Sequence, residues 1–101
     1  MTVLIDDPVW PAHDTYWAHL VSDASLDELH AFARSNGLPA RSFDLDHYDV
    51  PAERHATLVA AGAQHVPGKE LVRRLIASGL RVTERERRAR SGRTRTADEV
   101  D

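Results

Sequence analysis

The fold class is decided by the segment SLDELHAFARSNG, residues 25–37, which predicts a helix with both of its ends marked. Ser25 is an N-cap residue with Glu28 three positions later, which is the arrangement of a capping box. Gly37 stands just beyond the helix, where a left-handed backbone is favoured. Three apolar side chains recur at helical spacing, namely Leu26, Leu29 and Ala33. The helix therefore has one apolar face that must pack against another element.

Short strands and two further helices are predicted around this segment. The expected strands are residues 2–5, 19–22, 41–43 and 64–66. A second helix begins near Pro51 and ends at Gly62, and a third runs from about Gly68 to Gly79. The third helix is expected to pack through Leu71, Val72, Leu75 and Ile76. This alternation favours an α/β fold with a small, mainly parallel sheet of three to four strands flanked by three helices.

The chain is expected to form one domain with a C-terminal tail. Residues 1–80 hold all the predicted elements, and 101 residues allow one modest core. Residues 7–18 are read as a loop that is rich in aromatic side chains, namely Trp10, Tyr16 and Trp17. Residues 81–101 contain seven arginines and few apolar residues after Val82. We expect that basic segment to be disordered.

The amino-acid composition limits the kinds of molecule that this protein is expected to bind. The chain has no cysteine and no apolar run long enough to cross a membrane, so a cytoplasmic protein is expected. Residues 1–50 hold nine acidic side chains against two basic ones. Such a surface would repel a phosphate backbone, so specific nucleic-acid binding by the folded domain is not expected. A divalent cation, a small molecule or a protein partner suits it better.

Familiar local motifs are absent from the sequence. Residues 62–70 resemble a phosphate-binding loop, but the spacing of the glycines is wrong and Glu70 replaces the required Ser or Thr. Residues 44–46 begin like a calcium-binding loop without its later glycine and glutamate. Neither a zinc-protease motif nor a hydrolase elbow is present. Function must therefore be sought in side chains brought together by the fold.

Polar side chains gather at the predicted ends of two strands. Asp6 follows the first strand, and His47, Tyr48 and Asp49 lie just before the second helix. Carboxyl ends of parallel strands meet at one edge of a sheet, so these side chains are expected to meet there. His19 would join them if its short segment runs beside the first strand. The expected metal ligands are Asp6, His19, His47 and Asp49.

These residues admit a functional and a structural interpretation. Imidazoles and carboxylates together can hold a divalent ion or act as general acid and base. The expected catalytic residues are Asp6, His47, Tyr48, Asp49 and Arg54. In the structural interpretation, Asp49 caps the second helix and His47 bonds to a loop carbonyl. A third histidine, His30, is expected to be partly buried and oriented by Asp27.

Several stretches resemble a bacterial and phage family. They are TVLID at 2–6, WAHLVSD at 17–23, LDELHAFA at 26–33, HYDV at 47–50 and AAGA at 60–63. In this order they resemble the domain-of-unknown-function family numbered 4031, over about residues 2–80. The resemblance implies no activity. It does imply a recurring polar set, namely Asp6, His19, His30, His47, Tyr48 and Asp49, with Arg54 as a further candidate.

Two functions from different classes follow as hypotheses. The first is a metal-dependent or acid–base enzyme that acts on a small or phosphorylated substrate, with Tyr48 or Arg54 contacting that substrate. The second is a non-catalytic module that binds a ligand or a protein through its aromatic loop and acidic face. A polar cluster at strand ends favours the enzyme, whereas a chain of this size leaves little depth for a closed pocket.

Overall fold

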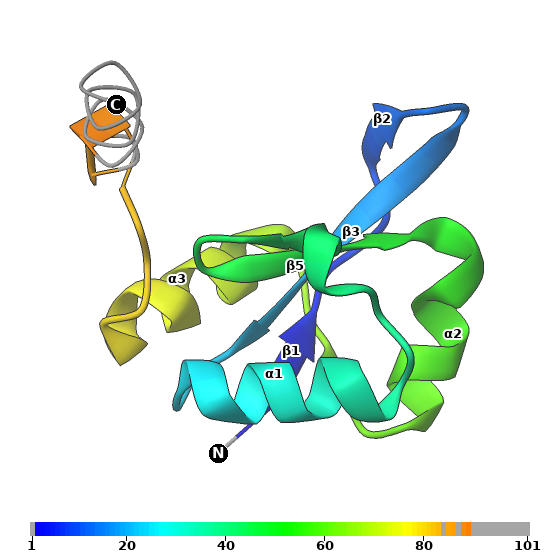
Figure 1. The fold of residues 1–101 in the computed structure, drawn as a ribbon, viewed down its shortest axis with the longest axis horizontal. Helices are drawn as coiled ribbons and strands as arrows, with labels where there is room; N and C mark the ends of the chain where they lie inside the picture. Colours follow the sequence, from blue (N-terminus) through cyan, green and yellow to red (C-terminus); the bar gives the residue numbers. More distant parts are fainter. Residues whose placement is uncertain (1, 84, 87, 90–101) are drawn as a thin grey trace, which may run out of the picture.

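The computed structural model describes residues 2–83, 85–86 and 88–89, and it confirms the α/β class with three helices (Figure 1). The strands are β1 (Val3–Ile5), β2 (Trp10–Ala12), β3 (Thr15–Ser22), β4 (Phe43–Asp44), β5 (His47–Pro51) and β6 (Gln64–His65). The helices are α1 (Leu26–Ser35), α2 (Ala52–Ala60) and α3 (Gly68–Ser78), with a short 3-10 turn at Ala40–Ser42.

The sheet is six-stranded and mostly antiparallel, so the prediction of a mainly parallel sheet was wrong. Its order is β4-β5-β3-β1-β6, with β2 paired to β3 outside this path. Among the strands that the structure describes, only β1 and β6 pair in parallel, because the connection from β5 through α2 returns the chain across the sheet before β6 begins. The other pairings are antiparallel. Two of these antiparallel pairs, β2–β3 and β4–β5, are hairpins. The predicted alternation of strands and helices along the sequence gave no sign of them.

Both hairpin turns contain residues with positive φ, and neither turn contains a glycine. His13 and Asp14, between β2 and β3, have φ values of 49° and 63°. Leu45, between β4 and β5, has a φ of 60°. Two-residue hairpins need positive φ and usually place Asn or Gly there, so neither turn carries the usual sequence signal. The predicted loop at 7–18 is consequently the β2 strand, the turn and the first half of β3.

Helices cover both faces of the sheet. One core packs α1 and α2 against residues of β1, β3 and β5, and its fully buried members include Ile5, Leu20, Leu29, Val50 and Leu58. A smaller core packs α3 against the other face through Leu4, Val21, Val66, Leu71 and Leu75. Figure 1 shows α3 apart from α1 and α2, on the far side of the strands. The α3 face of β3 and β5 is thus only partly covered.

The predicted helices are confirmed with small corrections. Ser25 Oγ accepts the N–H of Glu28 at 3.0 Å, as a capping box requires. Gly37 adopts the expected left-handed conformation, with a φ of 74°. Along α3 only Leu71 and Leu75 are buried. Val72 and Ile76 are 39% and 59% exposed, so the prediction that they pack into the core was wrong.

The C-terminal segment joins the fold further along than predicted. Val82 is buried, and its N–H donates to Asp46 Oδ2 at 2.8 Å. The Arg81 guanidinium lies 3.6 Å from the same oxygen. Arg81 and Val82, which follow the predicted domain boundary at residue 80, thus contact Asp46 in the turn between β4 and β5. Residues 84, 87 and 90–101 of the predicted tail lie outside the described residues, and their disorder stays a prediction.

Candidate metal centre

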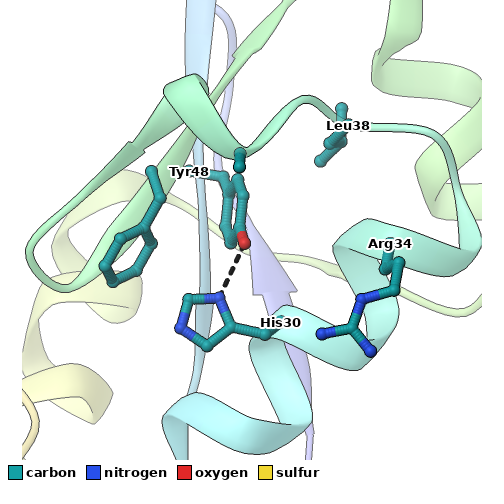
Figure 2. A pocket seen from close by; sticks show the side chains of 6 residues that line it. His30, Arg34, Leu38 and Tyr48 are labelled. Atoms are coloured by element: carbon teal, nitrogen blue, oxygen red, sulfur yellow. Dashed lines mark hydrogen bonds between the residues drawn. The ribbon is translucent and has the colours of Figure 1, made fainter.

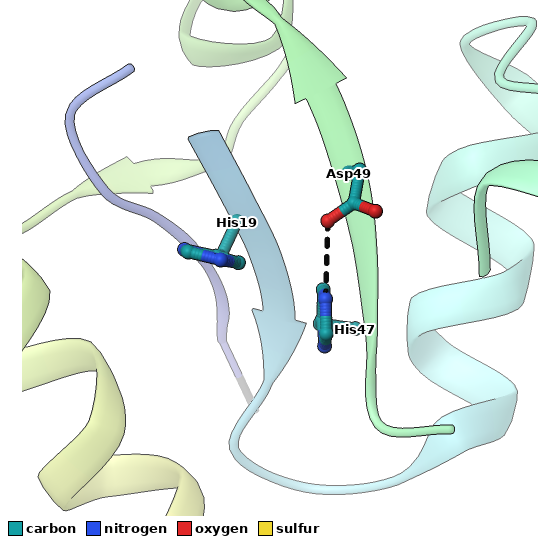
Figure 3. Close-up of side chains that lie close together, drawn as sticks. All are labelled: His19, His47 and Asp49. Carbon is teal, nitrogen blue, oxygen red and sulfur yellow. Dashed lines mark hydrogen bonds and ion pairs between the residues drawn. The ribbon is translucent and has the colours of Figure 1, made fainter. Parts of the chain in front are cut away.

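A His–His–Asp cluster lies on the α3 face of the sheet, across β3 and β5. His19 on β3 is directly opposite Asp49 on β5 in the antiparallel register. His47 precedes Asp49 by two residues, and alternation along a strand puts both side chains on the same face. Figure 3 shows the three side chains converging from these two strands. Their positions follow from strand pairing alone.

The three side chains of the cluster are close enough to hold one metal ion. One ligand atom from each of His19, His47 and Asp49 can be chosen so that all three lie within 4.8 Å of one another. His47 Nε2 is 3.1 Å from Asp49 Oδ1. The His19 and His47 rings meet edge to face with centroids 5.1 Å apart. Two nitrogens and a carboxylate oxygen at this spacing can hold one divalent ion.

Asp6 orients His19 from the neighbouring strand. It follows β1 and continues the pairing, since its N–H donates to the His19 carbonyl at 3.2 Å. Its Oδ1 accepts the His19 backbone N–H at 2.6 Å, and its Oδ2 is 2.9 Å from His19 Nδ1. The Asp6 side chain is buried by these contacts. Asp6 therefore holds the ring of His19.

Asp46 holds the second imidazole in the same way, and sequence reasoning missed it. The side chain is fully buried, and its Oδ1 is 2.7 Å from His47 Nδ1. Its Oδ2 accepts the Val82 N–H. The only local signal for Asp46 is that an acidic residue directly precedes His47. From the sequence, Asp46 is considered only within residues 44–46, which lack the later residues of a calcium-binding loop. Its role depends on Val82, which lies 36 residues away.

The two carboxylates contact the same nitrogen on each ring. Nδ1 of His19 and of His47 faces its own aspartate. In the absence of an ion, Nε2 of His47 contacts Asp49 Oδ1, so Nε2 is the nitrogen that each ring would offer to an ion in the cluster. Metal-bound histidines in proteins commonly donate their other ring N–H to a carboxylate, which fixes the tautomer and the ring orientation. Here two such aspartate–histidine pairs flank Asp49. An ion held by this cluster would therefore have both of its histidine ligands oriented by a carboxylate.

The electrostatics of the cluster favour positive charge. Burial opposes a charge on His47, but hydrogen bonds to Asp46 and Asp49 outweigh it and raise the pKa of His47 to about 9. Burial likewise opposes the charge of Asp46, yet His47, the Val82 N–H and Arg81 together hold the pKa of Asp46 below its usual 3.8. Without a bound ion, the protonated His47 ring supplies the positive charge that these carboxylates require.

We predict that the ion-free protein loses stability between pH 6.5 and 9. The folded pKa of His47 lies above its unfolded value of 6.5, so its contribution is complete below pH 6.5 and disappears as pH rises through about 9. The loss should be on the order of 2–3 kcal/mol. Urea unfolding with EDTA across this range measures it. An Asp49→Asn variant should show a smaller loss, and equal slopes in both proteins would contradict the assignment to His47.

The structure brings four predicted residues together but not at the predicted place. Asp6, His19, His47 and Asp49 are linked by the contacts above. Asp6 does follow a strand, β1, but His19 and Asp49 face each other within the antiparallel pair β3–β5 and His47 begins β5, whereas the prediction placed all four at the carboxyl ends of parallel strands. The structural alternative is not observed either, since the N-cap of α2 is Pro51 without a side-chain hydrogen bond, and His47 bonds to Asp46 and Asp49.

The other two predicted catalytic residues lie elsewhere. Tyr48 stands between His47 and Asp49 on β5, so its side chain points to the opposite face, where its hydroxyl is 2.7 Å from His30 Nδ1. That bond, rather than one to Asp27, orients His30. Arg54 on α2 donates to the carbonyl of Asn36. Neither residue belongs to the His–His–Asp cluster.

The fold and cluster define a small α/β protein with a candidate metal centre on one sheet face. Comparison with known families matches residues 3–78 to DUF4031, described as a protein of unknown function. The chain therefore belongs to that family. No curated protein and no solved structure matches it. Within the described residues, no helix is both long and apolar enough to span a membrane.

Proposed function

We propose that this protein is a metal-dependent enzyme whose ion is bound by His19, His47 and Asp49. The observation that carries the proposal is the convergence of these three ligand atoms within 4.8 Å, with each imidazole held by its own aspartate. A structural role would not require two buried carboxylates to orient two histidines toward one carboxylate. The site lies on a sheet of paired strands, which is a rigid support for a ligand set.

The chemistry of the ligand set indicates the kind of ion. Two imidazole nitrogens and one carboxylate oxygen suit zinc, and they also suit iron(II) and manganese. Three protein ligands leave room for water or substrate, as in catalytic rather than structural sites. The ligands are accessible enough for this, since the side chains of His19, His47 and Asp49 are 39%, 12% and 25% exposed. A small ligand can therefore reach the ion from solvent.

A bound divalent ion would supply a Lewis acid and an activated water. The proposed substrate is a small or phosphorylated molecule, because a divalent ion can polarise a phosphoryl or carbonyl oxygen. Trp10 on β2 stacks over His19, with ring centroids 6.3 Å apart and the planes inclined by 12°. It borders the site on one side and offers a flat apolar surface to a substrate. A cytoplasmic setting is part of the proposal.

One observation favours the non-catalytic alternative. The β2–β3 hairpin and the residue before it carry three exposed apolar side chains, namely Val9, Trp10 and Tyr16. Exposed aromatic side chains are frequent at protein interfaces. In that function the hairpin would contact a protein partner and the histidine cluster would serve only the fold. Metal binding separates the two candidates, because only the enzyme requires it.

The test is metal analysis of the purified full chain, followed by calorimetric titration with zinc, manganese and iron(II). We expect one equivalent of one ion per chain. His19→Gln and Asp49→Asn should each weaken binding at least tenfold, since either change removes one of three ligands. His65→Gln is the matched control, because His65 is exposed and pairs with Asp7 outside the cluster.

The outcomes are distinct. Binding that is lost in both cluster variants and kept in His65→Gln supports the metal centre. An ion-free protein that binds none of the three metals would refute it, and would leave the interaction module as the better candidate. Equal weakening of metal binding in all three variants would mean that several surface side chains bind the ion non-specifically, and it would contradict the proposed site. Circular dichroism of each variant shows whether the fold is retained.

A further inference from the structure

A pocket lies on the opposite face of the sheet from the candidate metal centre. It has a volume of about 370 Å³ and lies between α1, the segment around the 3-10 turn, and β5 (Figure 2). It is lined by His30, Arg34, Leu38, Ala40, Phe43 and Tyr48. This size is within the range of pockets that take small ligands. Neither Asp6 nor any residue of the His–His–Asp cluster belongs to it.

The pocket has an aromatic wall held in place by its own contacts. The His30 ring packs edge to face on Phe43 and on Tyr48, with centroids 4.6 and 5.7 Å apart. Phe43 and Tyr48 pack on each other at 5.2 Å. The Tyr48 hydroxyl bonds to His30 Nδ1, so the opposite ring nitrogen of His30 is left for another partner. These three rings form a preorganised surface for a flat apolar group.

The pocket also carries one positive charge. Arg34 lies in the last turn of α1, and Figure 2 shows its guanidinium beside the pocket near His30. Among the residues that the structure describes, no acidic group pairs with Arg34. A basic residue in the last turn stabilises the helix dipole, but that effect does not require a position at the mouth of a pocket. The guanidinium is free to meet an anion.

We propose that this pocket binds a small aromatic carboxylate. A guanidinium presents two parallel N–H donors that match a carboxylate, and a single positive charge matches a monoanion better than a phosphate dianion. The ring of the ligand would lie against Phe43 and Tyr48, where stacking and burial favour it. The free nitrogen of His30 offers one further hydrogen bond. Both requirements, the ring and the charge, are thus met by lining residues.

This site is independent of the proposed metal centre. Successive side chains of β5 point to opposite faces, so Tyr48 lines the pocket while its neighbours His47 and Asp49 lie in the metal cluster. The binding of a carboxylate to the pocket therefore needs no metal ion. Failure of one proposal leaves the other standing.

The test uses benzoate as the probe and the full chain with EDTA present. Benzoate titrated into ¹⁵N-labelled protein should shift the backbone signals of α1 near His30 and Arg34, and of Tyr48 on β5. Acetate, which carries the charge without the ring, should bind at least tenfold more weakly. Arg34→Gln should weaken benzoate binding about tenfold or more, because the charge-assisted pair is lost.

Arg41→Gln is the matched control, since Arg41 is exposed and close in the chain but does not line the pocket. It should leave benzoate binding within twofold of the parent. Equal weakening in both arginine variants would show general attraction of an anion and overturn the proposal. So would the absence of saturable benzoate binding, or shifts confined to the metal-centre residues of β3 and β5. Both arginines are exposed, so both variants are expected to fold.

Discussion

Replacing Asp46 with alanine is expected to destabilise the protein by about 3–5 kcal/mol. The carboxylate is fully buried and bridges two partners, His47 Nδ1 on one oxygen and the Val82 N–H on the other. Its removal leaves the His47 ring and a buried N–H without their acceptor, and unpaired buried groups cost far more than a lost surface bond. Urea unfolding at pH 7 measures the change.

Three comparisons separate the parts of this effect. Asp46→Asn keeps an acceptor for Val82 but removes the charge that faces His47, so it should cost less than Asp46→Ala. Val82→Pro removes the N–H donor and changes the buried side chain, whereas Val82→Ala changes the side chain and keeps the donor, so Val82→Pro should cost more. Asp27→Ala, at an exposed position on α1, should change stability by less than about 1 kcal/mol. A cost for Asp46→Ala as small as that for Asp27→Ala would contradict the buried network.

Replacing Leu75 with alanine is expected to cost about 3–4 kcal/mol of folding free energy. Leu75 is 1% exposed and belongs to the smaller core, where α3 meets Leu4 and Val21 of the sheet. This helix has few other buried side chains, so a cavity there removes much of the contact that docks it. Chemical denaturation measures the loss, and a hydrogen-exchange map should show it concentrated in α3.

Ile76→Ala is the matched control for this prediction. Ile76 is the next residue on the same helix and is 59% exposed, so its truncation should cost less than about 1 kcal/mol. Nearly equal costs for the two variants would mean that α3 docks through a different face. The pair thus tests the burial pattern of the helix directly.

The two large effects are linked through the chain. The segment that follows α3 brings Val82 to Asp46, and Asp46 orients His47. A loosened α3 should therefore also weaken the proposed metal centre. We expect Leu75→Ala to lower metal affinity although no ligand is changed, whereas Ile76→Ala should leave it unaltered. Calorimetry on the two variants measures this.

The sequence predicted which residues of the candidate metal site lie together, but not the strand arrangement that brings them together. Asp6, His19, His47 and Asp49 were expected to meet because parallel strands would gather their carboxyl ends. They meet instead because His19 and Asp49 are antiparallel neighbours and His47 shares their face. The polar residues stand out in an otherwise apolar strand pattern under either topology. Tyr48 and Arg54 were predicted as catalytic residues because they are close in sequence to His47 and Asp49. Closeness in sequence does not determine to which face of a strand or helix a side chain points.

Local sequence determined the features that depend on neighbouring residues alone. Ser25 and Glu28 mark the start of α1 and Gly37 its end, because caps act within one turn of helix. The same holds for the limits of α3 at Gly68 and Gly79. The order of the short stretches that resemble the family also sufficed to identify it, since that order requires no knowledge of contacts.

Tertiary structure alone decided which strands pair and in which direction. Strand direction depends on the hairpin turns at His13–Asp14 and at Leu45. Neither turn contains a glycine, and a leucine rarely adopts a positive φ, so the pairing of the strands imposes the conformation of Leu45. The tertiary structure also determined the hydrogen-bond partners of the polar groups. Asp46 accepts from the Val82 N–H, and His30 bonds to the Tyr48 hydroxyl rather than to Asp27. Such contacts join residues far apart in the chain, and a buried polar group takes whichever partner the packed fold provides.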